Sequence, residues 1–230
     1  MGNRFLWIGV IVIGGLFCWG VREFVGPNTS DVELQQMLEA MKQVKSFRGT
    51  YVGNTPSTQH SERLWELDCN RGILHKQSQE LPLSTNPVEV KDDEFLVGRD
   101  KKYTRTNDGS WEESKYTADL YSASWYCQAL AQGIVRDLVP DVRGLMKNGS
   151  LGKGDKKTVN GVRCQEWNYT NLARTSGQKG TLCIGLDDHL PYEMTVENRG
   201  RYTYSDFNQP LQFDAPQAVL DAASATEASN

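Results

Sequence analysis

The sequence has few of the residues that catalysis needs. Only three histidines, His60, His75 and His189, occur among its 230 residues. A histidine base requires a nucleophile and an orienting acid within reach, and no G-x-S-x-G motif is present. We therefore expect the protein not to be an enzyme and to need no cofactor. Asp187 and Asp188 precede His189, but aspartates are common at turns, so we expect no metal site there.

A basic stripe is also absent. The net charge is −4, with 25 Lys+Arg against 29 Asp+Glu. Nucleic-acid backbones bind clustered lysine and arginine, so we expect no nucleic-acid partner. The glycine-rich stretch 149–154 is followed by Asp155, which would repel a phosphate. We expect a flexible hairpin loop there.

Cysteine is scarce, and no C-x-x-C or Cys/His spacing typical of zinc is present. Cys18 lies in an apolar run, which leaves an even number of cysteines downstream. Cys164 and Cys183 lie on two strand-like stretches, and folding these as a hairpin places them opposite each other at disulfide distance. Cys69 and Cys127 then pair by elimination. Two disulfides indicate an oxidising compartment, and four reduced thiols in a cytosolic protein are the alternative.

The longest hydrophobic run, Phe5 to Val21, has no charge and is flanked by Arg4 and Arg22. As a helix it would span roughly 25 Å, near the lower limit for crossing a bilayer core. A cleaved signal ends in small-x-small residues, which residues 18–20 match poorly. A lipoprotein signal would have small residues before its cysteine. We therefore expect residues 1–30 to be a single-pass anchor, with a signal segment as the alternative, and the rest of the chain to lie on the periplasmic or extracellular side.

The rest of the chain predicts a helix, a series of strands, a second helix and further strands. A capping box, S-x-x-E, occupies 30–33, and apolar residues then recur at helical spacing: Leu34, Met37, Leu38, Met41 and Val44. Short strands with turn signals follow, a helix is expected over about 117–138, and strands resume afterwards. Residues 217–230 are small and polar, which predicts a mobile tail. The pattern indicates an α+β fold with an antiparallel sheet in one domain.

Several motifs fall in the same order: SFRGTY at 46–51, FLVGRD at 95–100, VNGVRC at 159–164, LCIG at 182–185, DHLPY at 188–192 and YTYSDFNQP at 202–210. Together with the capped first helix and the mid-chain helix, they resemble the LolA/LppX-type lipoprotein-carrier superfamily, which includes RseB-like periplasmic regulators. The resemblance covers residues 31–216. It implies a strongly curved antiparallel sheet, a half-open barrel of about ten or eleven strands, with helices packed in its concave side.

In that superfamily the space between sheet and helices is apolar and holds acyl chains of lipids or lipoproteins. The resemblance thus implies a membrane-tethered protein that binds a lipid or an acylated protein in an apolar cleft. A regulatory subunit with a closed cleft and a membrane-protein partner is the alternative. The candidate lining residues are Trp65, Leu67, Phe95, Val97, Tyr103, Trp111, Leu130, Ile134, Leu138, Trp167, Met194, Tyr202 and Tyr204.

Overall fold

The structure, a computed structural model, describes residues 29–55, 58–84, 88–115, 122–131, 149–171 and 178–227. The helices are α2 (Thr29–Lys42), α3 (Ala123–Ala131) and α5 (Gln217–Glu227). The strands are β1 (Ser46–Thr55), β2 (Thr58–Asp68), β3 (Ile73–Pro82), β4 (Val90–Val97), β5 (Lys101–Thr106), β6 (Glu112–Lys115), β7 (Gly149–Val159), β8 (Val162–Asn171), β9 (Gln178–Gly185), β10 (Pro191–Val196) and β11 (Gly200–Ser205). The expected anchor, residues 5–21, lies outside the described residues. Within them, no helix is long and apolar enough to span a membrane.

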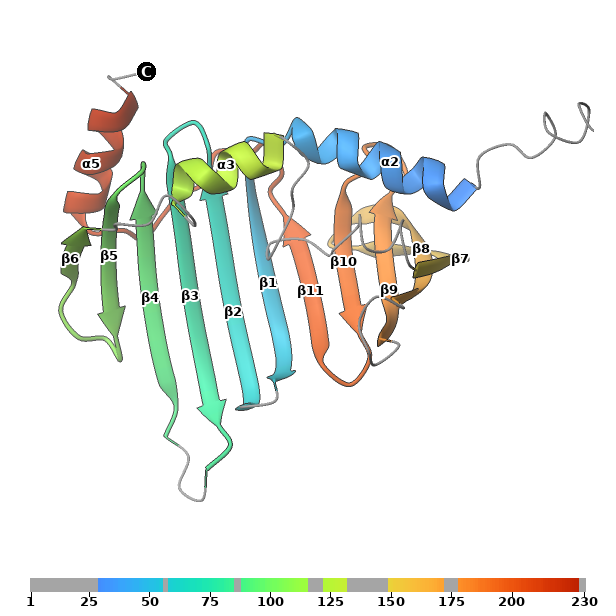
Figure 1. The fold of residues 1–230 in the computed structure, drawn as a ribbon, viewed down its shortest axis with the longest axis horizontal. Coiled ribbons are helices and arrows are strands. Elements are labelled where there is room, and N and C mark those ends of the chain that lie inside the picture. Colours follow the sequence, from blue (N-terminus) through green and yellow to red (C-terminus); the bar gives the residue numbers. More distant parts are fainter. Residues whose placement is uncertain are drawn as a thin grey trace, which may run out of the picture.

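All of these strands form one sheet of eleven strands, in the order β6-β5-β4-β3-β2-β1-β11-β10-β9-β8-β7 (Figure 1). Antiparallel pairing of β1 with β11, from Arg48 opposite Ser205 to Gly53 opposite Gly200, joins the two halves of the chain. The expected α+β fold with an open, curved antiparallel sheet is confirmed. One expectation is wrong: residues 149–154 are not a loop but the first half of β7, an edge strand paired with β8.

The two faces of the sheet carry different helices. Successive residues of a strand point to opposite faces. Phe47, Leu67 and Leu96 lie on one face and pack with α2 and α3 in one core cluster. The alternate residues Ile73 and Phe95 pack with α5 in a second cluster. We call the face under α2 and α3 the inner face, and the face under α5 the outer face.

Helix α2 packs as its sequence predicts. The four apolar residues of its stripe, Leu34, Met37, Leu38 and Met41, are buried, and Val44 is buried just after the helix. Figure 1 shows α2 and α3 in line across one end of the strands. The stripe therefore closes that end of the inner face.

Both expected disulfides are present. Cys69 in the β2–β3 turn is bonded to Cys127 of α3, with Cα atoms 5.5 Å apart, and Cys164 is bonded to Cys183 with Cα atoms 5.6 Å apart. We expected the cysteines of the second pair to lie directly opposite each other. In the structure they lie diagonally across the two strands. Cys164 faces Gly185 in the β8–β9 register, and Glu166 faces Cys183.

The predicted mobile tail is wrong for residues 217–227, which form α5. Its buried residues, Val219, Ala222 and Ala223, pack against Ile73, Phe95 and neighbouring residues of the outer face. These three residues recur at helical spacing, so they lie on one face of α5, the face turned toward the sheet. The domain therefore extends beyond the residue 216 boundary that the sequence suggested.

The packing of α5 can be tested by placing a charge beneath it. Val219 has no exposed surface, so Val219→Asp would bury an unpaired carboxylate, and we expect α5 to detach from the sheet. Limited proteolysis should then cleave the C-terminal segment at least about tenfold faster than in the unmodified protein. Ala218→Asp, at the exposed neighbouring position, is the control and should leave the cleavage rate unchanged. Equal cleavage of both variants would contradict this packing.

Candidate ligand site on the inner face

The structure divides the candidate lining residues between the two faces. Seven lie on the inner side: Trp65, Leu67, Leu130, Trp167, Met194, Tyr202 and Tyr204. Four belong to the outer cluster under α5 and so do not share a face with the other seven: Phe95, Val97, Tyr103 and Trp111. The remaining two, Ile134 and Leu138, lie outside the described residues. Aromatic content alone could not separate these groups because both faces are covered.

The helix-covered end of the inner face is solidly packed. Met37 and Met41 of α2 belong to the same buried cluster as Leu67 of β2 and Tyr204 of β11, and all four side chains are at most 1% exposed. Burial raises the pKa of the Tyr204 phenol well above its usual value, with smaller contributions from Tyr202 and Tyr169. This end is a core, with little room for a ligand.

Two residues further from the helices, the inner face becomes partly exposed. Trp65 lies two residues before Leu67 on β2, and Tyr202 lies two residues before Tyr204 on β11. The side chains of Trp65 and Tyr202 are only partly buried, as is that of Met194, which pairs with Tyr202. The Tyr202 ring centroid lies 6.2 Å from that of Trp65 and 4.7 Å from that of Tyr51. We call Tyr51, Trp65, Met194 and Tyr202 the inner-face aromatic group. It forms an apolar surface that continues the core toward solvent.

A charged pair borders this group. Arg63 lies two residues beyond Trp65 on β2, with its guanidinium carbon 6.0 Å from the centre of the Tyr51 ring. Its Nη2 is 2.6 Å from a carboxylate oxygen of Glu80. The inner face thus changes from a closed core to an apolar surface and then to a polar rim. Tyr51 was missing from the candidate list, although its spacing from Phe47 places both side chains on one face.

A second polar arrangement lies on the outer face. His75 is buried between two carboxylates, with Nδ1 2.8 Å from Glu66 and Nε2 2.7 Å from Asp93. Arg48 pairs with Glu66 at 2.6 Å and Arg105 with Asp93 at 2.7 Å, which gives alternating charges across β1 to β5. We call these five residues the charge row. Carboxylates only accept hydrogen bonds, so both ring nitrogens of His75 donate and the ring is an imidazolium.

The pKa values of the charge row follow from this geometry. Burial lowers the pKa of His75, but hydrogen bonds and charges from Asp93 and Glu66 outweigh it and raise the pKa overall. Burial raises the pKa values of Glu66 and Asp93, but His75 with Arg48 or Arg105 lowers both overall. Each side chain of the charge row forms an ion pair or hydrogen bond with another member, and the row contains no nucleophile. We therefore assign the row a structural role. No local sequence pattern indicates the charge row, because its members lie on different strands.

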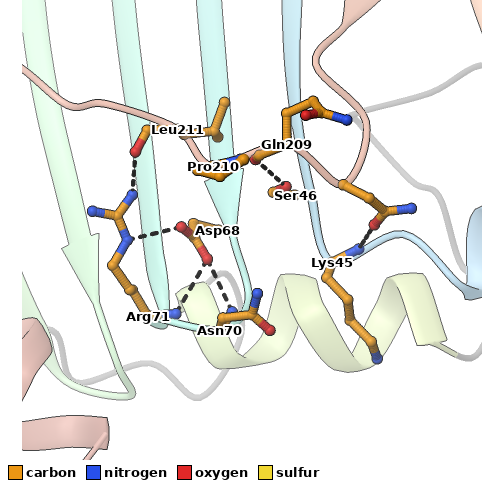
Figure 2. Close-up of a pocket in the computed structure, with 9 residues that line it drawn as sticks. Lys45, Ser46, Asp68, Asn70, Arg71, Gln209, Pro210 and Leu211 are labelled. Atoms are coloured by element: carbon orange, nitrogen blue, oxygen red, sulfur yellow. Dashed lines mark hydrogen bonds and ion pairs between the residues drawn. The ribbon is translucent and has the colours of Figure 1, made fainter.

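A polar pocket of about 380 Å³ lies where the segment after β11 crosses the ends of β1 and β2 (Figure 2). The Asp68 carboxylate accepts hydrogen bonds from the backbone N–H groups of Asn70 and Arg71 and from Arg71 Nε. Arg71 also donates to the carbonyl of Leu211, and its guanidinium carbon lies 4.7 Å from the Phe213 ring centre. These charged groups bond one another, so the pocket ties the crossing segment to the sheet. Among the described residues, no group of three or more His, Cys, Asp or Glu side chains could hold a metal ion.

The fold has relatives among solved structures. LprF from Mycobacterium bovis matches with a TM-score of 0.56 and 14% identity, over 82% of this chain and 97% of LprF. The chain has the LolA/LppX-like fold. MucB matches with a TM-score of 0.40 and 18% identity, over 84% of this chain and 63% of MucB. The MucA/MucB complex of Pseudomonas aeruginosa matches with a TM-score of 0.37 and 19% identity, over 82% of this chain and 59% of that chain. No protein-family model matches the chain, and no curated protein matches its sequence.

Proposed function

We propose that this LolA-like domain is a non-enzymatic, membrane-tethered binding protein for a lipid or a lipidated protein on the outer side of a cell membrane. The observation that carries the proposal is the inner-face aromatic group, where Trp65, Met194 and Tyr202 present partly exposed apolar surface next to a closed core. Removing such surface from water is favourable by about 25 cal/mol per Å². Each acyl methylene buried there would contribute about 0.8 kcal/mol.

The tether is the apolar run of residues 5–21, which precedes α2 by only a few residues. In this proposal the anchor leads directly into the helix that closes the inner face. The two disulfides fit a domain held in an oxidising compartment. A fixed tether suits a receptor or an assembly factor at the membrane surface better than a diffusing carrier.

A second candidate function is a regulatory subunit that binds a membrane protein and keeps its inner face closed. The burial of Met37, Met41 and Leu67 in one cluster favours it, because that end of the face is already filled. In that case the inner-face aromatic group would be covered by a protein partner. Lipid binding separates the two candidates.

Adding a charge to the inner-face aromatic group tests the proposal. We expect Trp65→Glu to weaken binding of pyrene-labelled phosphatidylethanolamine by at least about tenfold, because an acyl chain would then desolvate a carboxylate. Leu64→Glu, on the next residue of β2 and the outer face, is the matched control and should bind within about twofold of the unmodified protein. The measurement is a fluorescence titration, with circular dichroism to confirm folding. Equal losses in both variants, or none in either, would exclude this face as the lipid site.

A further inference from the structure

A cluster with one excess positive charge lies beside the inner-face aromatic group. Trp65 of β2 pairs with Lys76 of β3, and Lys76 pairs with Glu94 of β4, so the three side chains lie in one row on the inner face. The Lys76 ammonium is 3.3 Å from one carboxylate oxygen of Glu94, and the Lys102 ammonium is 2.5 Å from the other. Neither lysine pairs with a second carboxylate in the described part of the chain. One carboxylate thus balances only one of two ammonium groups.

The ammonium of Lys76 lies at the boundary between the closed core and the partly exposed surface. It is 5.3 Å from the centre of the ring of Tyr126, a buried residue of α3. The Lys76 side chain is nevertheless 28% exposed, and that of Glu94 is 23% exposed. The excess charge is therefore accessible to a ligand that lies on the aromatic group.

The other carboxylates of this face lie further from Trp65 or are already paired. Glu80 pairs with Arg63 at the rim. Asp92 lies two residues before Glu94 on β4, on the side away from α3, and accepts a hydrogen bond from Thr106. Glu112 of β6 lies three strands from Lys76, about 14 Å away. An anionic group at the end of a chain lying on Trp65 would therefore meet Lys76 before it met an unpaired carboxylate.

We propose that Lys76 binds the negatively charged headgroup of the acylated ligand, so that the site selects anionic lipids over zwitterionic ones. The inference rests on the proposed function and adds the chemical class of the ligand. The apolar side chains hold the acyl chain, and the Lys76 ammonium donates a charge-assisted hydrogen bond to a phosphate oxygen. From Lys76 on β3 to Met194 on β10 the inner face spans four strand spacings, roughly 19 Å. The ligand lies along this direction, across the strands.

Two lipids with the same chains and different headgroups provide the test. Dioleoyl phosphatidylglycerol carries a net negative charge, whereas dioleoyl phosphatidylcholine is zwitterionic. In competition against pyrene-labelled phosphatidylethanolamine, we expect the full chain in detergent to prefer phosphatidylglycerol by roughly five- to tenfold, the effect of one partly exposed charge-assisted hydrogen bond. The preference should shrink as salt is added, because ions screen exposed charges.

Substitutions of lysine separate the local contact from the overall charge. Lys76→Met removes the ammonium and keeps an unbranched side chain, so it should bind both lipids equally. Lys76→Arg keeps the charge and should keep the preference. Lys91→Met is the matched control, because it removes the same charge from an exposed position of β4 on the outer face, and it should also keep the preference. Circular dichroism confirms that each variant is folded.

The outcomes separate this inference from the proposed function. Equal binding of the two lipids by the unmodified protein would overturn the role of Lys76 and leave the lipid site standing. A preference that survives in Lys76→Met, or that is lost equally in Lys91→Met, would overturn it as well. Displacement of the labelled lipid by inorganic phosphate alone would assign the contact to free phosphate and overturn the lipid headgroup. Binding of neither lipid would overturn both proposals. Because the comparison in the unmodified protein needs no substitution, it holds even where a variant fails to fold.

Discussion

Replacing His75 with alanine is expected to lower the free energy of unfolding by about 3 kcal/mol. The substitution leaves Glu66 and Asp93 buried on the outer face without the imidazolium between them, and their side chains are only 6% and 9% exposed. Removing one partner of a buried pair costs about 3–5 kcal/mol, and we expect the lower end because Arg48 and Arg105 still neutralise the carboxylates. Urea unfolding followed by circular dichroism measures the loss.

His60 provides the control for this substitution. It also lies within hydrogen-bond distance of a carboxylate, at 2.9 Å from Glu62, but both side chains are largely exposed. His60→Ala should therefore change the unfolding free energy by less than about 0.5 kcal/mol. A loss at His75 no larger than that at His60 would show that the charge row contributes no stability.

The charge row also predicts the pH dependence of stability. The folded pKa of His75 lies above its ordinary value of 6.5, so its contribution is complete below pH 6.5 and is lost as the pH rises through the raised value. The pKa values of Glu66 and Asp93 lie below their ordinary 4.5 and 3.8, so their contributions are complete above pH 4.5 and are lost as the pH falls through the lowered values. The difference in stability between the unmodified protein and His75→Ala should be largest between pH 4.5 and 6.5. A difference that grows steadily toward alkaline pH would contradict this assignment.

Removing the Cys69–Cys127 disulfide by the double serine variant is expected to cost about 4 kcal/mol. The bond joins residues 58 apart, and the loss of a cross-link of this length gives the unfolded chain that much more conformational freedom. It also holds α3, whose Ala123, Tyr126 and Leu130 side chains pack on the inner face. Hydrogen exchange should therefore accelerate most in α3.

The second disulfide serves as the matched comparison, because its removal also replaces two cysteines. Cys164 and Cys183 are only 19 residues apart and lie on adjacent strands, so their loss should cost about 3 kcal/mol. The two double variants are compared by their urea midpoints under the same conditions. A smaller loss for the Cys69–Cys127 pair would falsify the ranking by loop length.

The parts of the fold that could be predicted from the sequence are those with a local or pairwise signal. The stripe from Leu34 to Met41 predicted the buried face of α2, and hairpin geometry predicted the Cys164–Cys183 bond. The antiparallel sheet followed from the spacing of turns and strands. The family resemblance then indicated how these elements are arranged, and the fold of the structure agrees with it.

The parts that could not be predicted depend on which face of the sheet each strand residue occupies. Phe95 and Tyr103 are as apolar as Trp65, but α5 covers them on the outer face. The small, alanine-rich sequence of α5 concealed a helix that buries Val219, Ala222 and Ala223 against the outer face. The glycine and lysine residues of β7 make its sequence look like that of a loop, because β7 is an edge strand that pairs with a neighbour on one side only.

Native mass spectrometry of the full chain, extracted from membranes in detergent, decides whether the inner face binds a lipid. We expect a protein carrying a mass adduct that fragments as an acylated lipid or lipopeptide, with the adduct lost in Trp65→Glu and retained in Leu64→Glu. A chain that carries only its polypeptide mass and instead co-purifies with a stable membrane-protein partner would contradict lipid binding on the inner face.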